Sequence, residues 1–367
     1  MLGQPLQLGT VSIPNRAILA PLAGVTDVPF RRICQEAGAG LTYVEMLSAA
    51  AVLIGSEQTL RMICRHPSEP VLGVQLTGKT PEEVAKASRY LAERDFDTLD
   101  INMGCPVRKV VKSGMGSAFL CDPQRITATV EATVEAVPIP VTMKTRIGFH
   151  KREITVEDTA ARAARAGAVM LTLHGRTREC TYGDPVQHEW IRAGAAAARR
   201  IRPDLVICGN GNILDQTSAN AMMRDTGCDC VMVSRGALGN PWIFEELVRG
   251  RTGQPTIGEW RDVVKRHLAY HEEHHGGHVA AVRTMRKHLI WYAKGFPNSS
   301  RFRLEAGHID DFASARALVD GFAAALPGTY RRFDEGGRNV REAAETDPKW
   351  SMDRELDRGV GHDGLAA

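Results

Sequence analysis

The stretch VLGVQLTGKTPEEVAKASRYLAERDFDTLDIN, residues 71–102, decides the fold class of this chain. Its two ends, 71–76 and 98–102, are short apolar runs of the length typical of buried strands. The segment between them, 80–95, opens with a threonine, a proline and two glutamates and then carries apolar residues at helical spacing. A strand, a helix and a second strand in this order predict a parallel βαβ unit.

The same alternation of strand and helix continues through most of the chain. A helix is expected at 155–168, and a short hairpin at 6–13 precedes the first parallel strand. The further strands are expected at 17–20, 41–46, 141–144, 169–174, 206–210 and 230–234. Eight parallel strands with intervening helices predict an α/β protein of the (β/α)8 TIM-barrel type. An open, doubly wound sheet is the alternative, but the Gly-x-Gly-x-x-Gly motif of a dinucleotide-binding fold does not follow the first strand.

Residues able to bind a ligand or do chemistry stand at or just beyond the C-terminal end of each predicted strand. In chain order they are Pro21, Glu45, Gln75, Asn102 with Cys105, Lys144 with Arg146, His174, Asn210 and Arg235. Any single one is best explained as a strand-end residue that bonds loop backbone. Catalytic groups of TIM barrels gather at this end, so the whole set predicts an active site there.

Composition sets limits on location and partners. The 367 residues are 43% hydrophobic and carry a net charge of +3, which permits a polyanionic partner without requiring one. No stretch reaches the roughly 20 apolar residues of a membrane helix and no signal peptide is recognisable, so a cytoplasmic protein without a membrane partner is expected. The eight cysteines should then be reduced thiols. Cys228 and Cys230 are a weak metal signal without partner histidines, and no metal site is expected.

Glycine-rich segments follow the last two predicted strands. CGNGNI, 208–213, and SRGALGNP, 234–241, place backbone N–H groups where barrels commonly bind a phosphate, and Arg235 can add a two-pronged contact. Two ordinary glycine turns are the simpler explanation, but a phosphate-bearing cofactor is the better inference. Lys144 and Gln75 suit the edge of a flavin ring, yet pyridoxal phosphate bound to Lys144 as a Schiff base also fits. The residues alone do not separate these cofactors.

Seven motifs, in order and with family-like spacing, resemble the tRNA-dihydrouridine synthases, in particular their bacterial B-type branch. They are APLAGVTDVPFR (20–31), NMGCPVRKVVKSGMGSAFLCDP (102–123), MKTRIG (143–148), HGRTR (174–178), GNGNI (209–213), SRGALGNPWIF (234–244) and MRKHLIWYAKGFP (285–297). The resemblance runs from about residue 4 to residue 325. It implies an FMN-binding catalytic (β/α)8 barrel, 1–250, and a small all-α tRNA-binding domain, 255–326. The implied activity is reduction of the C5=C6 bond of particular uridines in tRNA, with NADPH as the electron donor.

The resemblance also implies roles for individual residues. Cys105 would be the general acid that gives a proton to C5 of the uracil while reduced FMN gives a hydride to C6. A thiol suits this role because its ordinary pKa of about 8.5 keeps it mostly protonated at neutral pH. Asn102 would orient the uracil. The predicted tRNA contacts of the barrel are Arg108, Lys109, Lys112 and Arg176.

The implied FMN contacts come from the ends of several strands. They are Pro21, Leu22, Ala23, Gln75, Lys144, His174, Asn210, Gly211, Asn212, Ser234 and Arg235. In the family, Leu22 is often Met, Asn212 is often Asp and Ser234 is often Gly. Leu for Met nearly conserves side-chain volume, but the other two departures leave the FMN affinity open.

A capping box, TIGE at 256–259, opens the predicted helical domain. A second helix is expected within 278–297, ended by Gly295 and Pro297. Its apolar face consists of Val282, Met285, Leu289 and Tyr292. On a helical wheel Arg283, Lys287 and Lys294 lie on the opposite face, and together with Arg286 they are expected to track RNA phosphates. A merely solvated charged face is the simpler alternative.

Two other functions stay open. A flavin barrel of this kind can instead reduce a small pyrimidine or another enone-like molecule, and the basic helix would then have no task. An RNA-binding protein without catalysis is disfavoured, because Cys105, Lys144, His174 and Arg235 are all present. The target uridine, the preference for NADPH over NADH and the oligomeric state do not follow from the sequence. Mixed charges and glycines predict a mostly disordered tail at 328–367.

Overall fold

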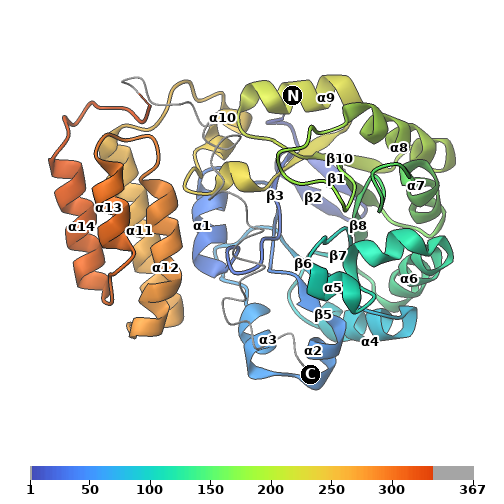
Figure 1. Ribbon diagram of the computed structural model, residues 1–367. Helices are drawn as coiled ribbons and strands as arrows, with labels where there is room; N and C mark the ends of the chain where they lie inside the picture. The colour runs from blue at the N-terminus through green and yellow to red at the C-terminus, as the bar shows by residue number, and fades with distance from the viewer. Residues whose placement is uncertain (1, 334–367) are drawn as a thin grey trace.

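A computed structural model describes residues 2–333, and within them eight parallel strands form a closed barrel (Figure 1). The strands are β3 (Ala17–Leu19), β4 (Thr42–Tyr43), β6 (Leu72–Thr77), β7 (Thr98–Met103), β8 (Val141–Arg146), β9 (Met170–His174), β10 (Val206–Asn210) and β11 (Cys230–Val233). They pair in the order β3-β11-β10-β9-β8-β7-β6-β4. The barrel closes where the Leu19 N–H donates to the Leu41 carbonyl at 2.9 Å, so the predicted (β/α)8 fold is confirmed.

One predicted strand is interrupted. The run 41–46 is a strand only at Thr42–Tyr43, and a separate β5 (Leu47–Ser48) pairs with the far end of β6. Between the two, the Glu45 carboxylate accepts the backbone N–H of Gly24 in the β3–α1 loop. The second strand is therefore broken at a residue that supports a neighbouring loop.

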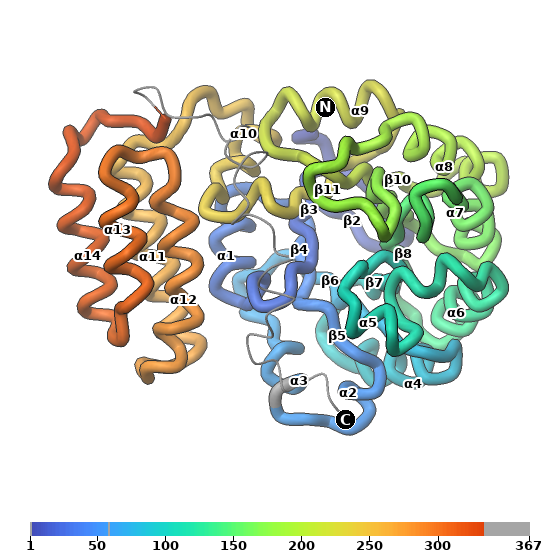
Figure 2. The backbone as a smooth tube through the Cα atoms, viewed as in Figure 1, coloured from blue at the N-terminus to red at the C-terminus, as the bar shows by residue number. Residues whose placement is uncertain are grey.

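Helices surround the barrel, and a hairpin lies at its N-terminal end (Figure 2). The hairpin is β1 (Leu6–Leu8) and β2 (Val11–Ile13), whose Leu8 and Ile13 pack among the strand residues of the barrel floor. The helices are α1 (Val28–Glu36), α2 (Ala49–Ile54), α3 (Glu57–Met62), α4 (Pro81–Ala92), α5 (Arg108–Lys112), α6 (Pro123–Ala136), α7 (Val156–Arg165), α8 (His188–Ile201), α9 (Gln216–Thr226) and α10 (Ile243–Arg249), with 3-10 turns η1 (Gly116–Cys121) and η2 (Arg235–Ala237). In the βαβ unit first quoted, Thr80 caps α4 by accepting the N–H of Glu83, as the sequence predicts.

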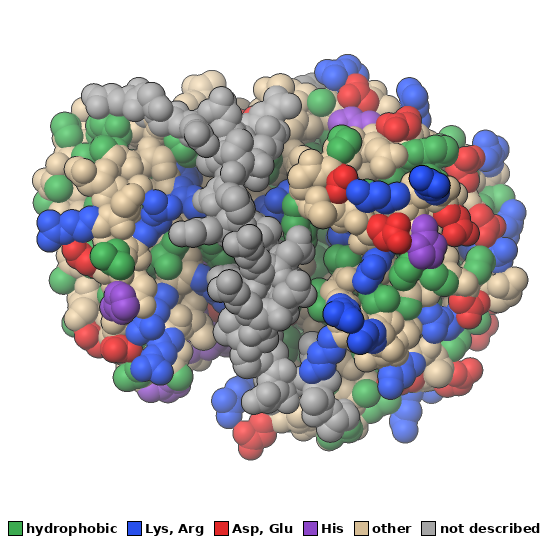
Figure 3. Space-filling view, in the orientation of Figure 1, with side chains coloured by type: hydrophobic (Ala, Val, Ile, Leu, Met, Phe, Trp, Pro, Cys, Tyr) green, Lys and Arg blue, Asp and Glu red, His purple; other side chains and the backbone are tan. Residues whose placement is uncertain are grey.

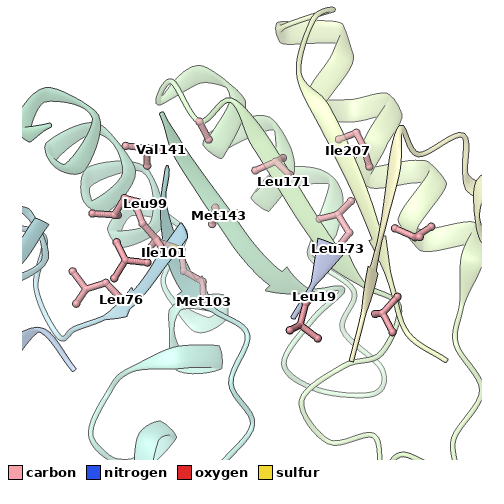
Figure 4. Close-up of a cluster of buried hydrophobic side chains, with 14 of the residues drawn as sticks. Leu19, Leu76, Leu99, Ile101, Met103, Val141, Met143, Leu171, Leu173 and Ile207 are labelled. Carbon is pink, nitrogen blue, oxygen red and sulfur yellow. The ribbon is translucent and has the colours of Figure 1, made fainter. Parts of the chain in front are cut away.

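Apolar and polar side chains alternate along the strands. Leu99, Ile101 and Met103 of β7 belong to the large buried cluster that the strands share with the surrounding helices (Figure 4). Asp100 and Asn102 occupy the alternate positions and point to the other side of the sheet. Because the sheet is closed, that other side is the barrel interior, and the strand register places polar groups there.

Four helices form a separate bundle beside the barrel, with α1 lying between the two (Figure 1). They are α11 (Ile257–His275), α12 (Val279–Tyr292), α13 (Ser299–Ala306) and α14 (Phe312–Ala324). The predicted capping box is present, since Thr256 and Glu259 bond each other's backbone at the start of α11. The predicted apolar face of α12 is buried against Trp260 and Phe302 of the bundle core.

The segment that follows the bundle is ordered further than expected. Although the tail is predicted from Gly328, the chain to Phe333 packs at the junction of bundle and barrel. Arg332 is 3% exposed and donates to the carbonyls of Lys294 (2.5 Å) and Gly239 (3.0 Å). Residues 334–367, where most of the predicted tail falls, lie outside the described residues. Over the described part of the chain, no helix combines the length and the apolar character that crossing a membrane requires.

Candidate active site

Hydrogen bonds between side chains join β6, β7 and β8 inside the barrel. The Gln75 amide donates to Asp100 Oδ2 at 2.7 Å and accepts from Asn102 Nδ2 at 2.9 Å. Thr142 donates to the other oxygen of Asp100 at 2.6 Å. All four side chains are buried, so this network fixes their orientation. The Gln75 amide, a predicted flavin contact, keeps one N–H and one lone pair for a ligand.

Cys105 lies in the loop after β7, and Asn102 holds the backbone of that loop. Asn102 Oδ1 accepts the N–H groups of Cys105 (2.9 Å) and Gly104 (3.1 Å). The Ser117 N–H donates to the Cys105 carbonyl at 3.0 Å. Gly116 has φ +59°, and a Cβ there would lie 2.8 Å from the same carbonyl oxygen. Gly116 therefore lets the following loop pack directly on Cys105.

The thiol of Cys105 is half-buried and protonated at neutral pH. Burial raises its pKa, while a hydrogen bond from the Val107 backbone and the charges of Arg146 and Lys144 lower it less. A protonated thiol in a fixed loop is a proton donor rather than a nucleophile.

Lys144 is a second cation of β8, two residues before Arg146. Burial, with a smaller contribution from Arg146, lowers its pKa to about 8. Burial raises the pKa of Asp100 to about 6, because the bonds from Thr142 and Gln75 only partly compensate. Within residues 2–333 the Lys144 ammonium has no hydrogen-bond partner. A half-buried cation without a hydrogen-bond partner is suited to an anionic or electron-rich ligand.

His174, at the end of β9, has one nitrogen bonded and one available. Asn210 Nδ2 donates to the Met232 carbonyl (2.8 Å) and to Ser234 Oγ (3.2 Å), which turns Asn210 Oδ1 toward His174 Nδ1 at 2.8 Å. Nδ1 must then carry the hydrogen. Burial and the charges of Arg146 and Lys144 hold the pKa of His174 well below its ordinary value. The buried Nε2, which has no partner among the described residues, is thus a neutral acceptor.

The loops after β10 and β11 are packed backbone to backbone. A Cβ on Gly236 would lie 2.2 Å from the Ile213 carbonyl oxygen, so this contact requires glycine. Arg235 donates to Asn212 Oδ1 at 2.9 Å and lies over the Tyr182 ring at 4.1 Å. A planar guanidinium held between an amide and an aromatic ring is a suitable group for binding phosphate.

Comparison with known proteins identifies the family. The model of the family described as "Dihydrouridine synthase (Dus)" matches residues 18–326. The chain belongs to the dihydrouridine synthase family. It is 37% identical to tRNA-dihydrouridine synthase B of Klebsiella pneumoniae over 86% of this chain and 98% of that protein. It is 33% identical to tRNA-dihydrouridine synthase B of Pasteurella multocida, over 86% and 95%. The resemblance drawn from the seven motifs is confirmed.

Solved structures of low sequence identity share the fold of this dihydrouridine synthase family member. Histamine dehydrogenase from Rhizobium sp. 4-9 has a TM-score of 0.55 at 13% identity, covering 89% of this chain and 65% of that one. The 6-hydroxypseudooxynicotine amine oxidase of Pseudomonas geniculata N1 has a TM-score of 0.57 at 13% identity, covering 91% and 68%. These two likenesses support the barrel architecture.

The predicted FMN contacts fall into three groups. Gln75, Lys144 and His174 lie in the barrel interior, and Asn210, Gly211, Asn212, Ser234 and Arg235 form the paired loops of β10 and β11. Pro21, Leu22 and Ala23 belong to the β3–α1 loop, where Leu22 is buried and Ala23 is exposed. The sequence therefore predicted a set of residues that the barrel brings to one end.

The predicted tRNA contacts divide into exposed and enclosed cations. Arg108, Lys109 and Lys112 of α5 are exposed, and within residues 2–333 none of them forms an ion pair. Lys and Arg side chains gather over α5 on the face that Figure 3 shows. Lys287 instead donates to the carbonyl of Gly24, so it joins α12 to the β3–α1 loop.

Several cations of the prediction are not free surface groups. Arg176 is 1% exposed and donates to the carbonyls of Tyr182 and Asp184. Lys294 is 9% exposed, and it lies beyond the end of α12 at Tyr292, so the helical wheel does not apply to it. Arg283 and Arg286 both bond Asp310. Arg283 is nevertheless 61% exposed, so the role of this face in tRNA binding stays a prediction, while Lys287 and Lys294 make contacts within the protein.

The structure gives roles to two residues of the site that the sequence does not predict. Arg146 was noted at a strand end but given no role, although it donates to the carbonyls of Gly104 and Thr177, each at 2.9 Å. Tyr182 lies in the long loop after β9, and its place over Arg235 depends on a fold that brings the two loops together. The position of Arg146 at a strand end suggests a role in the site. No local sequence pattern suggests one for Tyr182.

Proposed function

We propose that this protein is a tRNA-dihydrouridine synthase that uses FMN and NADPH to reduce the C5=C6 bond of uridines in tRNA. The observation that carries the proposal is the Cys105 loop, which Asn102 holds at the same end of the barrel as Lys144 and His174. The named relatives act on tRNA, which here implies the same substrate and a cytoplasmic site of action.

The residues that would hold FMN fit its chemistry. The unpaired Lys144 ammonium suits the polar edge of the ring, and the unpartnered His174 Nε2 can accept a hydrogen bond from a ring N–H or a ribityl hydroxyl. Arg235 and the loops around Gly211 and Gly236 suit the phosphate. When bound, reduced FMN supplies the hydride that adds to C6 of the uracil.

Cys105 supplies the second half of the reduction. Hydride addition at C6 places negative charge on C5 and O4, and the thiol gives its proton to C5 to complete the single bond. The resulting thiolate takes a proton from water before the next cycle. Arg146 and Asn102 do not transfer protons in this scheme; they hold the Gly104 and Cys105 backbone in place.

The substrate must reach this end of the barrel from a folded RNA. A uridine stacked inside tRNA has to be turned out before its ring can meet a cofactor held in the barrel. The exposed cations of α5 follow Cys105 directly and can bind the phosphates beside the extruded nucleotide. The helical bundle is the second surface available to the RNA.

The test is a comparison of two half-reactions. The purified protein should be yellow, NADPH should bleach it, and unmodified tRNA should restore the colour and yield dihydrouridine. Cys105→Ala should be bleached as fast as wild type but recover slowly, whereas Cys121→Ala, at an exposed cysteine on η1, should behave as wild type. Recovery with a free pyrimidine but not with tRNA would favour the small-molecule alternative. A protein that cannot bind FMN would contradict both.

A further inference from the structure

A histidine cluster lies where the helical bundle meets the barrel, away from Cys105 and Lys144. His267, His271 and His275 follow one another at four-residue spacing along α11, so they share one helix face. That face meets Asp27, which precedes α1 in the β3–α1 loop. His275 Nε2 is 2.9 Å and His271 Nδ1 is 3.5 Å from Asp27 Oδ2.

The hydrogen bonds of the two inner histidines leave one nitrogen of each ring available. His267 Nδ1 is bonded to the Tyr292 hydroxyl at 3.1 Å, and His271 Nε2 is bonded to Thr284 Oγ1 at 2.8 Å and to the Ala281 carbonyl at 3.1 Å. His267 Nε2 and His271 Nδ1 are buried and have no hydrogen-bond partner among the described residues. Both residues are fully buried.

We propose that Asp27, His267 and His271 bind a divalent transition-metal ion, with Zn²⁺ as the best fit to the donor set. One ligand atom from each of these three residues lies within 4.8 Å of the others, a spacing that a bound ion would tighten. Two imidazoles and a carboxylate are a donor set that zinc sites use. His275, on the same helix face, or a water can take the fourth position.

The surroundings of the cluster match those of a metal site. A metal-binding histidine usually has its second ring nitrogen hydrogen-bonded to a carbonyl, hydroxyl or carboxylate, as His267 and His271 have. Burial lowers the pKa of His267 to about 3 and that of His271 to about 4, so both rings are neutral at physiological pH. Neutral imidazole is the form that binds metal.

Hydrogen bonding alone explains the cluster less well. Two buried nitrogens without partners cost free energy that a core of apolar side chains would avoid. Asp27 already uses Oδ1 to cap α1 by accepting the N–H of Phe30, which leaves Oδ2 for the histidines. A metal would satisfy all three groups and would join α11 to the loop that holds Leu22 and Ala23. The proposal does not depend on the proposed redox activity.

The experiment measures metal binding by the full-length protein without a histidine tag. After chelator treatment and equilibrium dialysis against Zn²⁺, elemental analysis should find close to one Zn²⁺ per wild-type chain. His267→Asn keeps an amide at the position of Nδ1, and His271→Gln keeps one at the position of Nε2, so each variant retains its hydrogen bond and loses the available nitrogen. Each should bind Zn²⁺ more weakly by roughly 100-fold or more.

A histidine outside the cluster provides the control for Zn²⁺ binding. His308→Gln, at an exposed histidine of the bundle, should bind Zn²⁺ as wild type does. Co²⁺ is a second probe, because tetrahedral Co²⁺ absorbs at longer wavelength than an oxidised flavin and the absorption should disappear in both cluster variants. A wild-type chain that retains no Zn²⁺ above the His267→Asn chain would overturn the proposal. The proposal is also overturned if circular dichroism shows that all variants are folded and the cluster variants bind Zn²⁺ as tightly as the wild type.

Discussion

Asn102 Oδ1 accepts the backbone N–H of Cys105 at 2.9 Å, so a buried amide at the end of β7 positions the thiol three residues later. The same amide donates to Gln75, which donates in turn to Asp100. The Cys105 loop is therefore connected to the barrel interior through side chains that are themselves held by hydrogen bonds. Its position depends on the register of β6 against β7 as well as on the loop that contains it.

Replacing Asn102 should uncouple the two half-reactions. Asn102→Ala removes the acceptor for both loop N–H groups, and a displacement of the thiol by about 1 Å can cost on the order of 100-fold in rate. We expect slow flavin reoxidation by tRNA and unchanged reduction by NADPH, measured by stopped-flow absorbance of the flavin.

Asn102→Asp is the matched comparison. A carboxylate still accepts both N–H groups but cannot donate to Gln75, so the loss of rate should be smaller than in Asn102→Ala. If the two variants lose the same activity, the amide acts mainly on the uracil and not on the Cys105 loop.

The pH profile of the tRNA half-reaction should report the Cys105 thiol. Burial raises the pKa of the thiol above its ordinary value, and a general acid acts only while protonated. The rate should stay constant through neutral pH and fall only at alkaline pH, as pH rises through the raised pKa of the thiol. Single-turnover reoxidation with saturating tRNA measures this. A fall that begins near neutral pH would mean that the thiol is acidified, contrary to the structure.

Lys144→Met should stabilise the flavin-free protein. The folded-state pKa of about 8 lies below the ordinary 10.5, so the charged ammonium of this half-buried side chain destabilises the folded state at neutral pH. The penalty is fully present below pH 8, and it disappears as pH rises to the ordinary value. We expect the free energy of unfolding to increase by about 1 to 3 kcal/mol at pH 7, measured by denaturant titration.

The same substitution should weaken FMN binding, because the interior loses the cation that suits the ring. Lys144→Arg keeps the charge and adds bulk, so it separates the effect of charge from that of volume. Equal stability of the wild type and Lys144→Met at pH 7 would show that the ammonium has an anionic partner in the flavin-free protein.

The barrel was predictable because its signal is repeated eight times. Each strand is short, apolar and followed by a polar residue, and a closed barrel brings those residues together whatever the loops do. For the same reason Cys105, Lys144, His174 and Arg235 were recognisable at strand ends. The local pattern does not predict which of these side chains form hydrogen bonds with backbone groups that are distant in the sequence.

Arg176 and Lys294 illustrate that limit. A cation in the sequence looks the same whether it meets solvent or a carbonyl, and Arg176 became a loop support because two carbonyls after β9 turn toward it. The cluster of Asp27 with the α11 histidines is not recognisable in the sequence for a related reason. Its carboxylate and its imidazoles are distant in the sequence and meet only when the bundle packs on α1.

The exposed cations of α5 should contribute to tRNA affinity without affecting flavin chemistry. Replacing Arg108, Lys109 and Lys112 together by Gln removes charges that no described carboxylate neutralises. Each lost phosphate contact lowers the slope of log affinity against log salt by about 0.7 to 0.9. We expect a higher KM for tRNA, a slope reduced by about 2 and an unchanged rate of reduction by NADPH.

The charge-matched control replaces three exposed cations of α4, α7 and α8 by Gln, namely Lys86, Arg165 and Arg192. If both triple variants lose the same slope, net charge attracts the RNA; if only the α5 variant does, the phosphates lie beside Cys105.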